Sequence, residues 1–330
     1  MTSSIDRRTL LTTAAGLCAA TLSPFALAQG KPQLIYSDTV SDADPRAALL
    51  RDMFGGAIAG EFDFKPYFGA TLFKQGTEPV AMQRGNLDMA NLAAFDVQRQ
   101  IPAWSLVTTP YLFRDVAHMN KVFASDVGKE LFKMMEDQMG IKVLAVPYIG
   151  TRNLNLKPKT RIMKPADLAG IKLRMPGGEG WQFVGTALGA NPVPVAYTET
   201  YTALQTGAID GQDNPMSGTR TMKFYEVTSQ YVLTGHLIAN NLFSISLKKW
   251  ASLSPAQQKT LQTAADKFSA AVSAHIVKEE AELAAFFKAE GLQVYTPDLP
   301  AFRKHVLDVY AKSKFAKEWA PGMLERVNAL

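Results

Sequence analysis

The chain has 330 residues, of which 47% are hydrophobic and 20% are charged, with 23 Gly, 18 Pro and a single Cys. This composition excludes a wholly disordered chain, a collagen and a disulfide scaffold. The formal net charge is +5, but Lys and Arg are scattered, so neither a basic tail nor a nucleic-acid-binding stripe is indicated. The length allows one large domain or two of typical size.

The first 28 residues have the pattern of an export signal. Arg7 and Arg8 form a positive start, residues 9–22 are uncharged, and Ala26-Leu27-Ala28 is an A-x-A cleavage site. The paired arginines resemble a twin-arginine signal, and a general secretory signal is the alternative. We therefore expect an exported protein that is cleaved near Ala28 and works in the periplasm.

The only cysteine, Cys18, lies inside this signal. A lipid-anchored protein would have a small residue before that cysteine, but Leu17 occupies the position, so we expect no lipid anchor. The mature chain then has no cysteine, which suits an oxidising compartment.

In the first half of the mature chain, strands and helices are expected to alternate. A helix over residues 45–59 has Asp44 as its N-cap and Pro45 as its first residue, and Thr77 caps a short helix that ends at Gly85. The other expected elements are strands over 33–37, 62–67, 87–91 and 141–147, and a single helix over 115–139.

The second half repeats this order. Expected strands cover residues 170–176, 191–196 and 209–212, and expected helices cover 179–188, 199–206 and 215–225. Such alternation predicts an α/β fold with layered helices and mostly parallel strands.

A long helix is expected next, over residues 254–290. Ser254 and Gln257 have the spacing of a capping box, and Gly291 ends the helical composition. At 1.5 Å per residue this helix would be roughly 50 Å long, which exceeds the width of one small domain. We therefore expect it to contact both lobes of a two-lobed protein; a break near Ser273 is the alternative.

Catalytic and metal-binding motifs are absent from the sequence. The four histidines (118, 236, 275 and 305) lack the spacing of a zinc site. Neither a G-x-S-x-G motif nor a G-x-x-x-x-G-K-[ST] phosphate loop occurs. We therefore predict no catalytic residue, no metal site and no cofactor.

Two arginines follow or end expected strands. Arg152 comes after the strand over 141–147, and Arg174 lies near the carboxyl end of the strand over 170–176. Ligands of open α/β sheets bind at the carboxyl ends of strands, and a guanidinium matches a carboxylate with two parallel hydrogen bonds. By alternation, Leu173 and Met175 point away from Arg174. A surface ion pair is the alternative for either arginine.

Several longer motifs resemble one family. They are Gly-Ile-Lys-Leu-Arg-Met-Pro at residues 170–176, the run over 199–215, and shorter runs over 81–90, 110–113 and 223–227. In this order they are similar to the substrate-binding subunits of TRAP transporters, the DctP family, along the whole mature chain.

The resemblance implies a periplasmic binding protein, not an enzyme, made of two α/β lobes with hinge strands and a long helix across them. It implies a monomer without cofactor that captures one organic acid and delivers it to an integral membrane permease, which uses an ion gradient. We predict lobe I over residues 29–150 plus about 236–275, and lobe II over 151–235 plus about 276–330.

The same resemblance implies three site residues. Arg174 would grip the ligand carboxylate, Arg152 of the Gly-Thr-Arg motif would assist, and Asn214 would hydrogen-bond the ligand. Pro215 forces Asn214 into an extended conformation, and the amide offers both donors and an acceptor. A cap on the following helix is the alternative for Asn214.

Six further residues are candidates for the site. The Tyr197 hydroxyl is expected to reach the cleft, with plain packing as the alternative. Trp181, which follows the glycine-rich residues 177–180, is expected to stack on a ligand ring, with helix packing as the alternative. The first-lobe candidates are Phe95, Asp96 and Asn91, and Asn241 is a further one.

Two other functions fit the same sequence: an exported enzyme acting on organic acids, and a binding protein that presents its ligand to a sensor receptor. The ligand is not readable from the residues, since a C4-dicarboxylate, a sugar acid, an aromatic acid and a 2-oxo or hydroxy acid all fit one arginine. Trp181 and the adjacent glycines favour a ring-bearing monocarboxylate.

Overall fold

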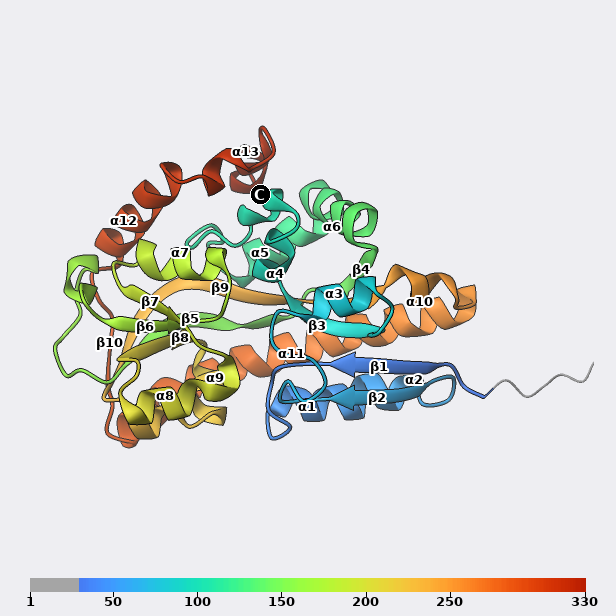
Figure 1. Ribbon diagram of the computed structural model, residues 1–330, viewed down its shortest axis with the longest axis horizontal. Helices are drawn as coiled ribbons and strands as arrows, with labels where there is room; N and C mark the ends of the chain where they lie inside the picture. Colours follow the sequence, from blue (N-terminus) through green and yellow to red (C-terminus); the bar gives the residue numbers. More distant parts are fainter. Residues whose placement is uncertain (1–29) are drawn as a thin grey trace, which may run out of the picture. The chain divides into compact units, whose positions relative to one another are not determined.

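The computed structural model describes residues 30–330, so the predicted export signal over 1–28 lies outside the described residues. Gln33–Leu330 forms one compact unit (Figure 1). Across residues 30–330, no helix combines a membrane-spanning length with sufficient apolar character.

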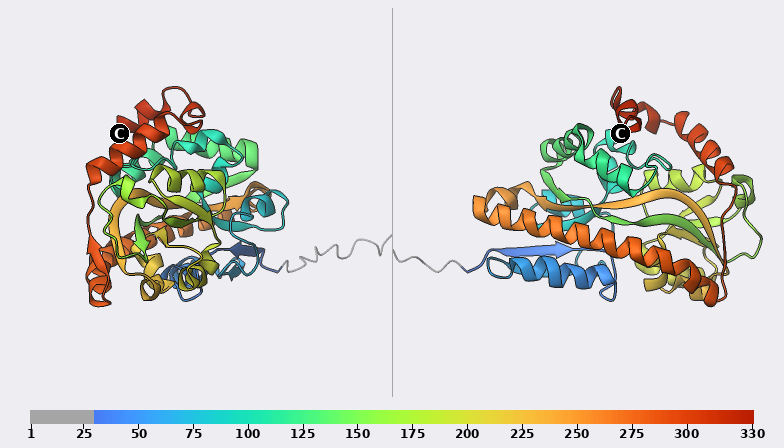
Figure 2. Two further views of the ribbon diagram at one scale, coloured as in Figure 1. Left: turned by 60° about the vertical axis from the view of Figure 1, so that its left-hand side comes forward. Right: turned by 180° about the vertical axis from the view of Figure 1, so that it is seen from behind.

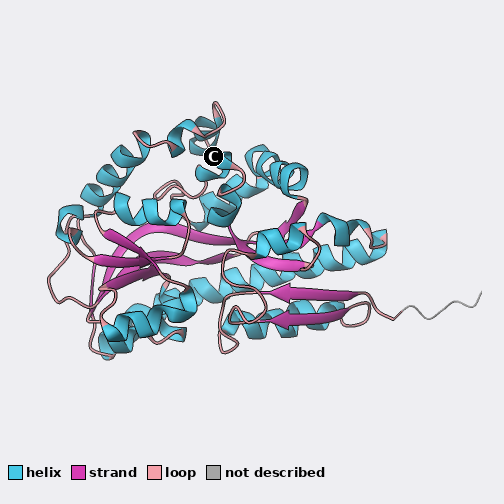
Figure 3. Cartoon of the chain, viewed as in Figure 1, coloured by secondary structure: helices cyan, strands magenta, loops and turns pink. Residues whose placement is uncertain are grey.

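A mixed sheet of ten strands runs through this described part of the chain (Figure 3). The strand order is β2-β1-β3-β9-β5-β8-β6-β7, and β4 and β10 also pair with β9. The strands are β1 Gln33–Ser37, β2 Asp63–Tyr67, β3 Met89–Ala93, β4 Ile141–Ala145, β5 Tyr148–Leu156, β6 Lys172–Met175, β7 Asn191–Pro194, β8 Gly211–Asn214, β9 Gln230–Ser246 and β10 Gln293–Tyr295.

Strand β9 connects the two halves of the sheet. Its first half pairs antiparallel with β5, and its second half pairs antiparallel with β3 and β4. The parallel pairs are β1 with β2 and β3, β6 with β7 and β8, and β9 with β10. The prediction of mostly parallel strands is therefore only partly right, because β5 and β9, neither of which was predicted, contribute every antiparallel pair.

The helices that were predicted lie close to their expected positions, whereas α4, α10, α12 and α13 were not predicted. Pro45 begins α1 as predicted, and Asp44 accepts a hydrogen bond from the backbone N–H of Arg46. A π-helical turn over Leu50–Gly55 joins α1 to α2. The helices are α1 Pro45–Leu49, α2 Gly56–Ile58, α3 Glu78–Gln83, α4 Ala94–Gln98, α5 Val116–Ala124, α6 Asp126–Met139, α7 Glu179–Ala187, α8 Thr200–Thr206, α9 Met216–Thr221, α10 Leu247–Ala251, α11 Pro255–Ala289, α12 Leu299–Ala311 and α13 Met323–Asn328.

Two helix predictions are wrong in detail. The expected single helix over 115–139 consists of α5 and α6, which are separated by Ser125 in an extended conformation. Gly128 lets the two helices meet closely, because a Cβ there would lie 2.1 Å from the carbonyl oxygen of Phe123. Thr77 precedes α3 but its side chain makes no capping hydrogen bond to it.

The long helix is confirmed as α11, 35 residues without a break. Ser254 and Gln257 form the predicted capping box. The alternative of a break near Ser273 is wrong, because α11 continues through this residue. The Ser273 hydroxyl accepts a hydrogen bond from the backbone N–H of Tyr148 at 3.0 Å. Seen from behind, α11 runs across the sheet (Figure 2).

Two large clusters of buried hydrophobic side chains lie on either side of the point where β9 changes partners. The first is built on β1, β3, β4 and the second half of β9. The second is built on β5, β6, α7 and the first half of β9. Helix α11 contributes Leu261 and Ile276 to the first cluster, and Leu283 to a smaller third one. The lobe boundaries themselves stay a prediction.

Candidate functional site

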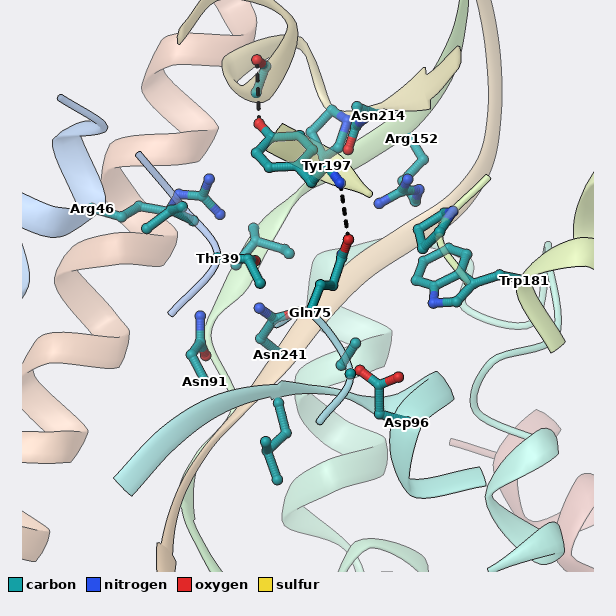
Figure 4. Close-up of a pocket in the computed structure, with 18 of the residues that line it drawn as sticks. Thr39, Arg46, Gln75, Asn91, Asp96, Arg152, Trp181, Tyr197, Asn214 and Asn241 are labelled. Carbon is teal, nitrogen blue, oxygen red and sulfur yellow. Dashed lines mark hydrogen bonds between the residues drawn. The ribbon is translucent and has the colours of Figure 1, made fainter. Parts of the chain in front are cut away.

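A cavity of about 90 Å³ lies between residues of β3, in one half of the sheet, and residues of β5, β6 and β8, in the other half (Figure 4). Eight of the nine predicted site residues line it: Asn91, Asp96, Arg152, Arg174, Trp181, Tyr197, Asn214 and Asn241. Phe95 instead lines a smaller adjoining pocket. A shallower hollow of about 430 Å³ shares Thr39, Gln75 and Tyr197 with the cavity, but it has no arginine, so the first cavity is the candidate site.

Arg174 lies in β6 and is fully buried, with 0% of its surface exposed. Its neighbours Leu173 and Met175 belong to the second hydrophobic cluster, which confirms the predicted alternation. Nε donates to the carbonyl oxygen of Val195 at 2.8 Å. Neither terminal nitrogen has a hydrogen-bond partner within residues 30–330.

Burial lowers the pKa of Arg174 to about 10, and the nearby Arg152 acts in the same direction. The side chain nevertheless stays charged at neutral pH. A buried cation with two free donors is costly. The arrangement is therefore suited to receive an anion with two acceptor oxygens, the geometry of a carboxylate.

Arg152 lies within β5 rather than after a strand as predicted, and it is buried. Its Nε and Nη2 donate to the carboxylate of Asp213 at 2.7 and 2.9 Å, and Nη2 also donates to the Asp213 carbonyl oxygen at 2.6 Å. His236 lies 3.2 Å from the same carboxylate. Although burial acts against it, the Arg152 guanidinium holds the pKa of Asp213 well below its usual range.

The ion pair of Arg152 with Asp213 is therefore buried and does not lie on the surface. It uses Nε and Nη2 of the guanidinium, two of the three nitrogens that would otherwise bind a ligand. Arg152 still lines the cavity. Its role as a second ligand contact stays a prediction.

Asn214 ends β8 and is followed by Pro215, the N-cap of α9. Its Nδ2 donates to Gln212 Oε1 at 2.5 Å, and α9 receives no side-chain cap. The helix-cap alternative for Asn214 is therefore wrong. Gly150 of β5 packs on Pro215, where a Cβ would come within 2.4 Å of the proline, so this glycine permits the close approach of β5 to the turn.

Tyr197 and Trp181 take part in both packing and cavity lining. The Tyr197 backbone N–H donates to Gln75 Oε1 at 3.1 Å, and its hydroxyl donates weakly to the Gly218 carbonyl oxygen at 3.5 Å (Figure 4). The ring of Trp181 stacks on Phe95 with centroids 3.6 Å apart. The Arg152 guanidinium lies 4.7 Å from the same ring centre. These contacts favour packing over the predicted ligand stacking for Trp181.

Sequence reasoning missed five polar lining residues of the cavity: Thr39, Arg46, Gln75, Glu78 and Ser217. Of these residues, only Arg46 lies next to a feature that the sequence indicated, because it follows the predicted N-cap Asp44 by two residues. Asp44 does cap α1, and it also binds the Arg46 guanidinium at 2.7 Å. The other residues come from loops and helix starts that local patterns do not orient.

Two carboxyl groups give the cavity a pH-sensitive side. Burial raises the pKa of Glu78 to about 8, with Asp96 and Asp38 acting in the same direction. Burial also raises the pKa of Asp96 to about 6, although Arg99 opposes the shift. Near neutral pH, Glu78 is therefore largely a neutral donor rather than an anion that would repel an acid ligand.

Comparisons with known proteins identify the family of the chain. A family model described as bacterial extracellular solute-binding protein, family 7, matches residues 41–318. The sialic acid-binding periplasmic protein of Vibrio cholerae is 32% identical over 264 residues, covering 80% of this chain and 82% of that protein.

Solved structures give the same result. A TRAP periplasmic solute-binding protein from Roseobacter denitrificans with bound 3-deoxy-D-manno-oct-2-ulosonic acid (KDO) has a TM-score of 0.89 at 42% identity, over 91% of this chain and 99% of that chain. One from Polaromonas, bound to D-erythronate, has a TM-score of 0.82 at 28% identity, over 91% and 99%. The chain therefore belongs to family 7 of the bacterial extracellular solute-binding proteins and has the fold of the TRAP periplasmic binding proteins, a non-enzymatic class.

Proposed function

We propose that the protein captures a hydroxylated sugar acid by its carboxylate group and delivers it to the membrane subunits of a TRAP transporter for ion-gradient-driven uptake. The observation that carries the proposal is the Arg174 guanidinium, which is buried and has two terminal nitrogens without a partner among the described residues. A ligand carboxylate supplies both the opposite charge and two acceptors in matching geometry.

The class of acid is proposed from two relatives. The Roseobacter denitrificans protein has KDO bound and the Polaromonas protein has D-erythronate bound; both are hydroxylated monocarboxylates. The cavity of the present chain offers amides and a hydroxyl that suit several ligand hydroxyl groups: Asn91, Asn214, Asn241 and Ser217. These polar groups favour a sugar acid over an aromatic acid.

Capture works by closure of two lobes with the boundaries predicted above. Two contacts join residues far apart in the chain beside the cavity, the hydrogen bond between Gln75 and Tyr197 and the stack of Phe95 on Trp181. Closure over the acid excludes water and strengthens the charged hydrogen bonds. The acid therefore shifts the population toward the closed form.

The proposed setting is the periplasm, after cleavage near Ala28, with a monomer that docks on integral membrane permease subunits. The family is non-enzymatic, which contradicts the exported-enzyme alternative. Presentation of the ligand to a sensor receptor is a different use of the same binding step, and deletion of the permease genes separates the two functions. Uptake of the acid is lost if the protein serves the transporter and is retained if it serves only a receptor.

The test is a thermal-shift screen of the mature protein against dicarboxylates, aromatic acids, 2-oxo acids, aldonates, uronates and KDO, followed by calorimetry. Hydroxylated sugar acids should raise the melting temperature with concentration. Arg174→Ala should abolish the shift, whereas Arg161→Ala, an exposed arginine packed on Tyr295 outside the cavity, should keep it. Binding only to dicarboxylates or aromatic acids, or full binding by Arg174→Ala, would overturn the proposal.

A further inference from the structure

Asn91 presents an unpaired acceptor to the cavity. The residue lies on β3, and its Nδ2 donates to Asp38 Oδ2 at 3.2 Å. Its Oδ1 is buried and finds no hydrogen-bond partner in the described part of the chain. Asn91 lines the cavity near Asn241. In Figure 4 these two residues lie in the lower part of the view, and Arg152 and Asn214 lie across the cavity in the upper part.

The orientation of this amide follows from Asp38. The carboxylate of Asp38 is buried and accepts hydrogen bonds from the Tyr36 hydroxyl at 2.6 Å and from the Val40 backbone N–H at 3.1 Å. A carboxylate that accepts from its other neighbours requires a donor from Asn91 as well. Turning the amide over would bring two acceptor oxygens together, so the NH₂ group faces Asp38 and Oδ1 faces away from it.

The polar groups of the cavity therefore differ between its two sides. Arg174, from β6, offers two free donors, whereas Asn91, from β3, offers a free acceptor. Free donors suit a carboxylate, but a free acceptor can pair only with a ligand group that carries a hydrogen. On a sugar acid that group is a hydroxyl.

We propose that Asn91 is a specificity-determining residue that accepts a hydrogen bond from a hydroxyl group of the bound acid, and that Asp38 is the positioning residue that holds Asn91 in this orientation. The inference rests on the proposed function and goes beyond it, since it states which ligand feature is required besides the carboxylate. An acid without that hydroxyl leaves Oδ1 buried and unpaired, which weakens its binding by about 10- to 100-fold.

The experiment measures the affinity of KDO, and of its analogues that each lack one hydroxyl group, by calorimetry. The proteins are the wild type, Asn91→Leu, Asp38→Ala and Tyr36→Phe. Asn91→Leu removes the acceptor at similar size. Tyr36→Phe is the matched control, because it removes another donor to Asp38 and leaves the pairing of Asp38 with Asn91 intact.

We expect the wild type to bind one analogue about 10- to 100-fold more weakly than KDO. Asn91→Leu and Asp38→Ala should lose this selectivity, and Tyr36→Phe should keep it. If Asn91 had a purely structural role, Asn91→Leu would bind KDO and all analogues more weakly by the same factor. Such a uniform loss would overturn this inference but not the proposed function. Because the wild-type comparison needs no variant, equal wild-type affinity for KDO and every analogue would also overturn it. A wild type that binds only acids without hydroxyl groups would overturn the proposed function as well.

Discussion

Replacing Arg174 by methionine should separate ligand binding from folding. Methionine keeps much of the volume and the apolar stem but removes the charge and the two free donors. Truncating one partner of a buried charge pair costs about 2–5 kcal/mol. We therefore expect the affinity for a sugar acid to fall by about 30- to several-thousand-fold.

The stability of the ligand-free protein should change much less. Burial lowers the pKa of Arg174 from 12.5 to about 10, which corresponds to about 3 kcal/mol of unfavourable burial at 1.36 kcal/mol per pH unit. Removing the charge relieves this cost. The variant also loses the hydrogen bond to the Val195 carbonyl oxygen, which costs about 1–3 kcal/mol. The two effects oppose each other, so the free energy of unfolding should stay within about 2 kcal/mol of the wild-type value.

The assay combines calorimetric titration with urea denaturation of the ligand-free protein. Arg174→Lys is the matched charge-preserving variant, and it should still lose at least about 10-fold in affinity, because an ammonium cannot form two parallel hydrogen bonds. Affinity within threefold of wild type for Arg174→Met would refute the carboxylate assignment. A large loss of stability in that variant would refute the opposing-effects argument.

Three further outcomes follow from the contacts in and around the cavity. Gln75→Ala removes the hydrogen bond to Tyr197 and should raise the dissociation rate of the ligand about 2- to 10-fold in stopped flow; the surface variant Gln83→Ala should leave that rate unchanged. Burial raises the pKa of Glu78 to about 8 from an ordinary 4.5, so its protonated form stabilises the fold below pH 4.5 and this stabilisation is lost as pH rises through about 8. Between these two pH values the melting temperature of the wild type should therefore fall more than that of Glu78→Gln. Melting temperatures of the two proteins that change in parallel with pH would contradict the raised pKa. Asp213→Asn breaks a buried ion pair and should lower the free energy of unfolding by about 3–5 kcal/mol; a change below 1 kcal/mol in urea denaturation would show that the pairing with Arg152 matters little.

Local patterns were sufficient for elements whose residues interact with near neighbours in the chain. The capping box at Ser254 and the unbroken helical composition to Glu290 placed α11, observed over Pro255–Ala289, within one residue at each end. Alternation around Arg174 indicated correctly which side chains enter the core. The same rules failed at Ser125, because the break there depends on two helices packing closely at Gly128.

Long-range contacts account for what the sequence reasoning missed. Strand β9 is held by a partner from each half of the sheet, β3 and β5, and its mixture of polar and apolar residues has no strand pattern of its own. The pairing of Arg152 with Asp213 joins residues that are 61 positions apart, so strand spacing could suggest Arg152 as a free ligand contact but not reveal its partner.

The export pattern, the alternating α/β elements, the long helix and the arginine at position 174 are all encoded by short stretches of sequence, because each depends on periodicity, capping or a contiguous motif. The direction of the Asn91 amide, the ion pair that holds Arg152 and the raised pKa values of Glu78 and Asp96 depend on burial and on neighbours brought from other strands and loops. These properties come into existence only when distant segments pack together, since desolvation and hydrogen-bond geometry belong to the folded chain and not to any one segment of it.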